Sequence, residues 1–187
     1  TKESLLWKSN IGTGMFRKIF FTLLFIFIFQ QSYSQKYYMG IGGRAGKFYS
    51  GASLKYFFNP TNATGVQLEA TYANIASGGF NLKGFVIKQL PFKIPIIQLP
   101  LDFVYGVGMH AGFFPFATQG YYKKVDGEAD YYDKDVVTIG IDATVQVEYK
   151  IPRVPVTLTI DFVPFYEFVN RGPENFDFGV SIRYVFK

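Results

Sequence analysis

The stretch from residue 136 to residue 149, VVTIGIDATVQVEY, constrains the fold of this chain more than any other. Every second residue is apolar: Val137, Ile139, Ile141, Ala143, Val145, Val147 and Tyr149. Between them stand Thr138, Gly140, Asp142, Thr144, Gln146 and Glu148. Because successive side chains of a β-strand point to opposite faces, the alternation predicts a strand with one apolar and one polar face.

The same period of two recurs from Lys36 to the end of the chain, and no segment has a helical period. The pattern is least regular in 80–89, where Lys83 and Phe85 share a face. An even number of antiparallel strands can close into a barrel with both termini on one side. We therefore expect an all-β fold, an eight-stranded antiparallel up-and-down barrel. Its predicted strands are 37–46, 49–58, 64–73, 80–89, 101–112, 136–149, 154–163 and 176–186.

The predicted connections differ in length between the two ends of this barrel. Residues 59–62 and 150–153 form short turns, and 91–100 is a proline-rich apolar link. At the opposite end lie the longer segments 113–135 and 170–175, the first of which is strongly polar. Short turns at one end and long polar loops at the other are typical of outer-membrane barrels.

Two environments explain strands with one apolar face. A soluble barrel buries that face in its centre, whereas a membrane barrel turns it toward lipid and encloses the polar face in a lumen. About ten residues at ~3.3 Å each, tilted by roughly 40°, span the ~25 Å apolar band of membrane barrels. Aromatic residues also gather near strand ends, as in interfacial girdles: Tyr37, Tyr38, Tyr56, Phe57, Phe58, Phe113, Phe114, Tyr184 and Phe186. We therefore expect transmembrane β-strands.

In a membrane barrel the polar face becomes the lumen, and eight strands leave only enough room for side chains to fill it. Buried charges are tolerated when they are paired, so we predict a structural charge network in the lumen. Its predicted members are Arg44, Lys55, Glu69, Lys83, Asp102, His110, Asp142, Glu148, Asp161, Asp177 and Arg183. The alternative interpretation of these charges is a path for ions or protons.

A leader precedes the barrel. After Met15, the basic pair Arg17 and Lys18 is followed by an eleven-residue apolar run, Ile19–Phe29, and by small residues before Gln35. Eleven residues fall short of the ~20 that a transmembrane helix needs, so this pattern predicts a secretory signal peptide. The predicted organisation is residues 1–14 as upstream translation without structural role, 15–34 as signal peptide with cleavage near Ser34/Gln35, and 35–187 as the barrel domain.

The charge balance argues against nucleic-acid binding. The whole chain has 19 basic and 14 acidic residues, but four of the basic ones and one of the acidic ones lie in residues 1–34. The remainder has a net charge of +2, too small for a nucleic-acid-binding surface. The chain has no cysteine, which excludes disulfides and thiolate metal sites.

Four segments together resemble small outer-membrane β-barrel proteins of Bacteroidota, similar to the OmpA membrane domain and the opacity proteins. They are SYSQ, KQLPFKIPIIQLPLDFVYGVGMHAGFF, GIDATVQVEYKIPRVPVTLTIDFVPF and FGVSIRYVFK, and the likeness spans nearly all of residues 35–187. The resemblance implies an eight-stranded barrel in the outer membrane of a Gram-negative bacterium. It also implies outer-membrane lipid and the barrel-assembly machinery as partners, with Tyr184 and Phe186 as the assembly signal.

Catalytic and cofactor motifs are weak. His110 is the only histidine, and position 112, where outer-membrane lipid A deacylases have the serine that pairs with theirs, is Gly112. GIGGRA and GVGMHA match a dinucleotide-binding pattern, but neither precedes a helix, as such a site requires. We expect no cofactor, no metal and no catalytic residue.

The expected function is therefore non-enzymatic: a structural or surface-interaction role through the long loops, with loop 113–135 as the candidate site for a protein partner. Two alternatives stay open, a lipid-modifying enzyme that uses His110 and a narrow pore or small-solute binder.

The predicted facing leads to a test on neighbouring residues. Ile141→Arg should cost roughly 2–4 kcal/mol of unfolding free energy because it places a charge in lipid near the midplane. Asp142→Asn should cost less and leave membrane insertion intact. Urea unfolding in lipid vesicles measures both, and the reverse order of sensitivities would contradict the predicted facing.

Overall fold

The computed structural model describes residues 37–59, 63–74, 78–93, 100–115, 121–126 and 128–186. The predicted upstream segment and signal peptide lie outside the described residues. Eight strands form the barrel: β1 (Met39–Gly46), β2 (Tyr49–Asn59), β3 (Thr64–Ala73), β4 (Phe80–Lys93), β5 (Pro100–Phe114), β8 (Val136–Lys150), β9 (Val156–Val169) and β10 (Phe176–Phe186).

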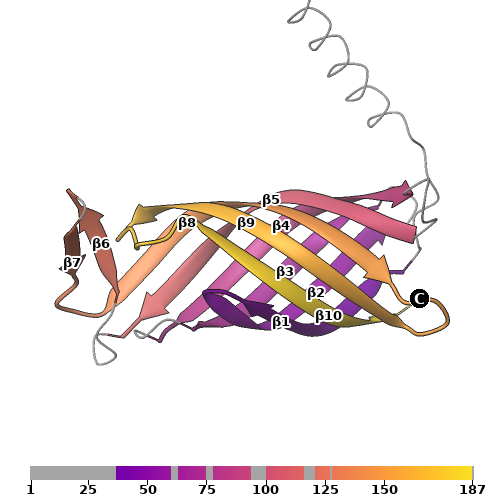
Figure 1. Cartoon of the computed structure of the whole chain (residues 1–187), viewed down its shortest axis with the longest axis horizontal. Helices are drawn as coiled ribbons and strands as arrows, with labels where there is room; N and C mark the ends of the chain where they lie inside the picture. Colours follow the sequence, from indigo (N-terminus) through magenta and orange to yellow (C-terminus); the bar gives the residue numbers. More distant parts are fainter. Residues whose placement is uncertain are drawn as a thin grey trace, which may run out of the picture. The chain divides into compact units, whose positions relative to one another are not determined.

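These strands form one closed antiparallel sheet in which each strand pairs with its neighbour along the chain, and β10 returns to pair with β1 (Figure 1). The closing seam runs from Met39 opposite Phe186 to Gly46 opposite Gly179. The predicted all-β, eight-stranded, up-and-down barrel is thereby confirmed. No helix among the described residues is long and apolar enough to cross a membrane.

The segment predicted as one long polar loop contains a small hairpin. Strands β6 (Tyr122–Val125) and β7 (Glu128–Tyr131) pair only with each other and lie at the end of the barrel that carries the longer loops (Figure 1). Phe113 and Phe114, which were expected in this loop, complete β5 instead.

Strand β9 is longer than the predicted strand 154–163 because it continues beyond Pro164. A proline has no N–H to donate to the sheet, so the strand predicted from the sequence ends just before Pro164. The structure keeps the same register on both sides of Pro164: Asp142 is opposite Phe165 and Val145 is opposite Phe162, and the two strands do not pair between these positions. The sheet therefore tolerates the proline as a local gap in the β8–β9 ladder.

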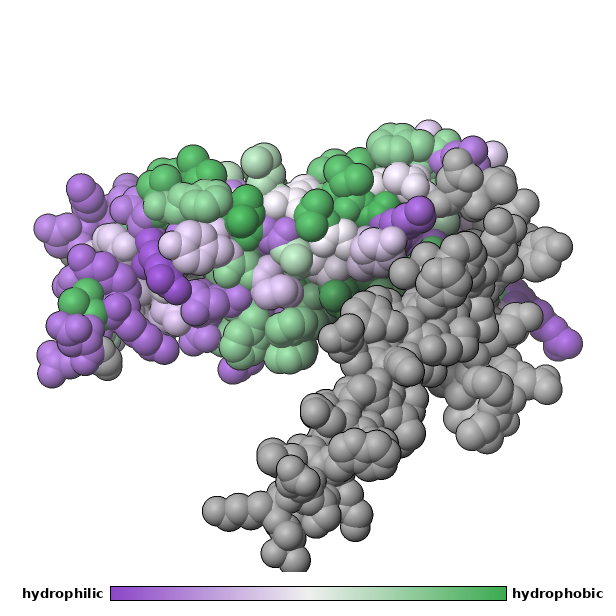
Figure 2. Space-filling view, turned by 90° about the horizontal axis from the view of Figure 1, so that it is seen from above, coloured by the Kyte–Doolittle hydropathy of each residue, from purple (hydrophilic) through white to green (hydrophobic). Residues whose placement is uncertain are grey.

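The apolar face of the barrel strands points outward and the polar face points inward. On β8, Val137 and Ile139 are about half exposed, whereas Thr138 and Thr144 between the outward residues are at most 1% exposed. In Figure 2 hydrophobic side chains gather over the barrel wall, and hydrophilic ones gather at the end that bears β6 and β7. The alternation seen in the sequence thus separates an outer apolar surface from a polar interior.

Strand β4 is irregular in sequence because its inward face is mixed. Lys83, Phe85, Ile87 and Gln89 are all buried, so charged, aromatic, aliphatic and amide side chains share the lumen side.

The aromatic residues expected in the girdles are divided between the outside and the inside of the barrel. Tyr38, Tyr56, Phe58, Phe113, Tyr184 and Phe186 are exposed on the outside, but Tyr37, Phe57 and Phe114 point inward and are buried.

Close contact between neighbouring strands at β1 depends on glycine. A Cβ added to Gly42 would collide with the backbone of Ile182 and Arg183 on β10, the nearest atom being the Ile182 carbonyl oxygen. A Cβ at the next residue, Gly43, would meet nothing closer than the Gly51 carbonyl oxygen at 3.7 Å. The two glycines therefore differ sharply in the space around them.

We expect Gly42→Ala to lower the unfolding free energy by about 1–3 kcal/mol, because backbone atoms of β10 must move to admit the methyl group. The matched control, Gly43→Ala, should change it by less than ~0.5 kcal/mol. Urea unfolding of the two variants compares them, and equal midpoints would contradict the close packing at the β1–β10 seam.

Candidate functional site

The lumen holds every charged residue predicted for the inward face. All eleven, Arg44, Lys55, Glu69, Lys83, Asp102, His110, Asp142, Glu148, Asp161, Asp177 and Arg183, are at most 4% exposed. Each comes from the polar face of a barrel strand, which is why the period of two brings residues so far apart in sequence into one interior. The structure divides them into two networks, a smaller pair and a cluster at the loop end.

The first network surrounds Arg44 on β1. Its guanidinium donates through Nε to Asp161 Oδ1 at 3.1 Å, through Nη1 to Asp177 Oδ2 at 2.8 Å, and through Nη1 to the Tyr49 carbonyl oxygen at 2.9 Å. Glu69 lies 3.8 Å away from Nε. The fork of an arginine can serve several acceptors at once, so one cation holds β1, β9 and β10 together.

The second network surrounds Glu148 on β8. Its carboxylate accepts hydrogen bonds from Lys55 Nζ at 2.7 Å and from the Tyr37 hydroxyl at 2.8 Å. Arg183 Nη1 lies 3.9 Å from the same carboxylate and donates to Thr159 Oγ1 at 2.9 Å. The nearby cation and the hydrogen-bond donors offset the free-energy cost of removing this carboxylate from water.

Two glutamines join these networks. Gln67 donates to Glu69 at 2.8 Å, and Gln146 donates to Gln67 at 3.1 Å. Lys55 in turn donates to the carbonyl oxygen of Gln146 at 3.3 Å. Asp102, by contrast, accepts a hydrogen bond from the Gln89 amide at 2.7 Å and forms the smaller pair.

The third group lies toward the loop end and centres on His110. Its Nδ1 is 2.9 Å from Asp142 Oδ2, and its Nε2 is 3.7 Å from Glu167 Oε1. Glu167 also accepts hydrogen bonds from the Tyr121 hydroxyl, at 2.8 Å, and from the backbone N–H of Gly172. Because Tyr121 belongs to the segment before β6 and Gly172 to the β9–β10 loop, one buried carboxylate anchors two loops to the barrel.

Lys83 lies near this group without a hydrogen-bond partner for its ammonium group. Its Nζ is 4.6 Å from the centre of the Tyr49 ring and 5.3 Å from that of Phe165. Both distances fall within the range of cation–π attraction. Aromatic faces therefore take the place of a carboxylate for this buried cation.

Two apolar clusters accompany the charged networks inside the barrel. One contains Tyr37, Phe57, Phe85, Ile87, Val104, Val163 and Val185. The other, which we call the loop-end cluster, contains Phe48, Tyr49, Ala73, Phe114, Tyr121, Val136 and Phe165. Within it Tyr121 stacks on Phe114 with ring centres 4.1 Å apart. These side chains fill the lumen between and around the ion pairs.

Sequence reasoning missed Glu167, Tyr37 and Tyr121. Glu167 follows the inward period of β9, but it lies beyond Pro164, where the predicted strand ended. Tyr121 lies in the segment 113–135, which was predicted as a polar loop, yet it is 5% exposed. Burial and the charge of Glu167 raise the pKa of the Tyr121 phenol, so it stays protonated and donates to that carboxylate.

The arrangement binds its own loops and strands together, and it places no set of three or more His, Asp or Glu ligands around a metal position within the described residues. Tyr184 and Phe186, the predicted assembly signal, lie on the outer face of β10 with ring centres 4.9 Å apart. The fold and its interior thus define a class: small closed β-barrels of eight strands with a side-chain-filled lumen.

No protein-family model matches the chain, and the search of curated proteins found no match to it.

Arg44 offers a direct test of the lumen network. Arg44→Met should cost about 3–5 kcal/mol of unfolding free energy because Asp161 and Asp177 lose their buried cation. Lys124→Met, which removes a cation from the exposed hairpin, should change it by less than ~0.5 kcal/mol. Equal effects in urea unfolding would show that the buried ion pairs do not stabilise the barrel.

Proposed function

We propose that the chain is an integral outer-membrane β-barrel protein with a sealed lumen and a non-enzymatic role, either structural or in surface interactions. The observation that carries this proposal is the apolar outer surface. Every barrel strand contributes to it a large apolar side chain that is between 41% and 66% exposed: Ile41, Tyr56, Leu68, Val86, Met109, Ile141, Ile160 and Ile182.

A belt of this kind is unfavourable in water, because soluble monomers rarely expose apolar patches larger than a few hundred Å². In lipid the same belt is favourable, and the closed sheet satisfies the backbone hydrogen-bonding groups that lipid cannot. A bilayer is therefore the environment that fits the outer surface, and export across the inner membrane fits the leader predicted in residues 15–34.

The loops are the part of the protein that we propose to face a partner outside the cell. Tyr131 and Val125 on the hairpin are well exposed, and Tyr122 is partly exposed, whereas Tyr121 and Tyr132 pack inward. Lys123 and Asp130 form an exposed pair across the hairpin. A protein partner would thus meet a mixed surface of two tyrosines and charged residues on β6 and β7.

His110 supplies the one observation in favour of the enzymatic alternative, because its Nδ1 lies 2.9 Å from Asp142, as in a catalytic dyad. Its other nitrogen faces Glu167, however, and the residue is only 3% exposed. A structural role of His110 in the loop-end group explains these contacts without a substrate. Unchanged lipid A mass spectra after His110→Ala would support that role.

Cell fractionation and gel mobility test the proposal together. Expressed in a Gram-negative host, the protein should enter the outer-membrane fraction and migrate faster on gels when unheated than when boiled, because the closed barrel resists detergent. Trypsin added to intact cells should cut at Lys123, Lys124 or Lys134 and spare the barrel. Recovery as a soluble periplasmic monomer would contradict the proposal.

Planar-bilayer recordings test the sealed lumen separately. The ion pairs and apolar clusters should keep conductance at the level of a protein-free bilayer. Stable channel openings by the parent protein would instead favour the pore alternative.

A further inference from the structure

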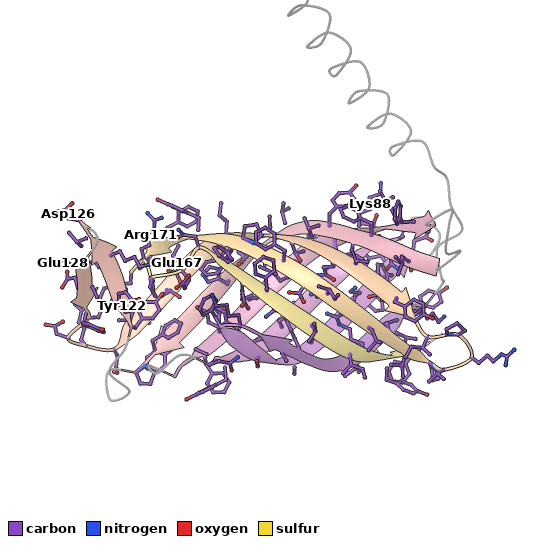
Figure 3. The ribbon with its side chains drawn as sticks, in the orientation of Figure 1. Lys88, Tyr122, Asp126, Glu128, Glu167 and Arg171 are labelled. Carbon is purple, nitrogen blue, oxygen red and sulfur yellow. The ribbon has the colours of Figure 1, made fainter. Side chains whose placement is uncertain are left out.

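A small cavity lies at the loop end, beneath the β9–β10 loop. Four aromatic residues, Phe48, Tyr49, Tyr121 and Phe165, line it together with Glu167 and Glu174. Its free volume is about 10 Å³, which is room for one group of the size of a water molecule. Figure 3 shows Glu167 and Arg171 at this end, and Lys88 toward the opposite end.

The charge at this cavity is negative and lacks a full countercharge. The Glu167 side chain is almost completely buried, and the one potentially cationic group within 4.0 Å of its carboxylate, among the described residues, is the imidazole of His110 at 3.7 Å. Among the residues that the structure describes, no Lys or Arg lies within 4.0 Å of the Glu167 or Glu174 carboxylates. Each Glu167 oxygen accepts one hydrogen bond and has lone-pair capacity for another.

Across the described lumen the same imbalance holds. The buried residues include four Lys or Arg (Arg44, Lys55, Lys83 and Arg183) and His110 against seven carboxylates (Glu69, Asp102, Asp142, Glu148, Asp161, Glu167 and Asp177), so the carboxylates are in excess even when the imidazole is charged. Arg44, Lys55 and Arg183 lie within 4.0 Å of other carboxylates, and Lys83 lies against rings. A cation bound in the loop-end cavity would therefore reduce an existing excess of negative charge inside the barrel.

The rings of this cavity are also suited to a cation. Lys83 Nζ approaches Tyr49 and Phe165, and Lys47 Nζ lies 4.6 Å from the centre of the Phe48 ring. Neither lysine lines the cavity itself. Three of the aromatic residues that line the cavity, Phe48, Tyr49 and Phe165, are thus ones that already attract ammonium groups, and they stand beside Glu167 and Glu174.

From this geometry we propose that the loop-end cavity binds the primary ammonium group of an external ligand, such as the end of a linear alkylamine or a lysine side chain. Glu167 accepts its hydrogen bonds, the rings enclose it, and Glu174 attracts it from the rim. The small volume admits an –NH3+ group and excludes a quaternary ammonium. The site requires only that the loop end face solvent, so it does not depend on the membrane proposal.

An NMR titration of the folded, full-length chain in detergent micelles tests this site, with the Gly172 amide as reporter because it donates to Glu167. n-Butylammonium should shift this signal saturably. n-Butanol, which has a similar shape and no charge, should give no saturable shift, and tetramethylammonium should bind at least ~10-fold more weakly. Equal responses to the three probes, or no saturable response to n-butylammonium, would overturn the proposal.

Two variants locate the binding. Glu167→Gln keeps the size of the side chain and removes its charge, so the Kd for n-butylammonium should rise at least ~10-fold, which corresponds to about 1.4 kcal/mol. Glu128→Gln removes the same charge from the exposed hairpin and should leave the Kd within about twofold. An unchanged Kd in Glu167→Gln would place binding elsewhere. Should Glu167→Gln fail to fold, the ranking of the three probes on the parent chain decides the question.

Discussion

Closure of the sheet is the constraint on which the rest of this structure depends. The seam between β1 and β10 removes the last unpaired strand edges of the barrel and separates two surfaces of opposite character. Once the sheet is closed, polar side chains on alternate residues have no access to water and must find partners inside. The charge networks around Arg44 and Glu148 are the result, and Gly42 permits the close approach of strands that closure requires.

The interior is organised so that the cost of buried charge is shared among neighbouring strands. Arg44 connects β1 to β9 and β10, while Glu148 on β8 receives donors from β2 and from the segment before β1. Glu167 extends the same principle to the loops, because it holds Tyr121 and Gly172. The arrangement of the loop end is therefore tied to the barrel interior, which connects the chemistry of the lumen to the surface that a ligand or partner would meet.

Much of the fold could be predicted from the sequence because a period of two is a direct consequence of strand geometry. The strand around Ile141 and Asp142 has an unbroken alternation, and its facing agrees with the structure. The pattern becomes ambiguous where the lumen itself is partly apolar, as at Phe85, or where a proline interrupts the ladder, as at Pro164. Glu167 was missed for the second reason. The pairing of Tyr121 with Glu167 joins residues 46 positions apart, and no local pattern predicts such a contact.

The most direct test of the central claim is a cysteine scan of residues 137–148 on β8, in vesicles, with a nitroxide on each single cysteine; the chain has no native cysteine to interfere. Oxygen dissolved in lipid should reach the labels at odd-numbered positions, while those at even-numbered positions should be shielded from both oxygen and a water-soluble nickel complex. Oxygen accessibility that alternates along the strand, high at odd-numbered and low at even-numbered positions, would support an apolar wall in contact with acyl chains. Even-numbered labels open to the nickel complex, with odd-numbered labels shielded from oxygen, would contradict it.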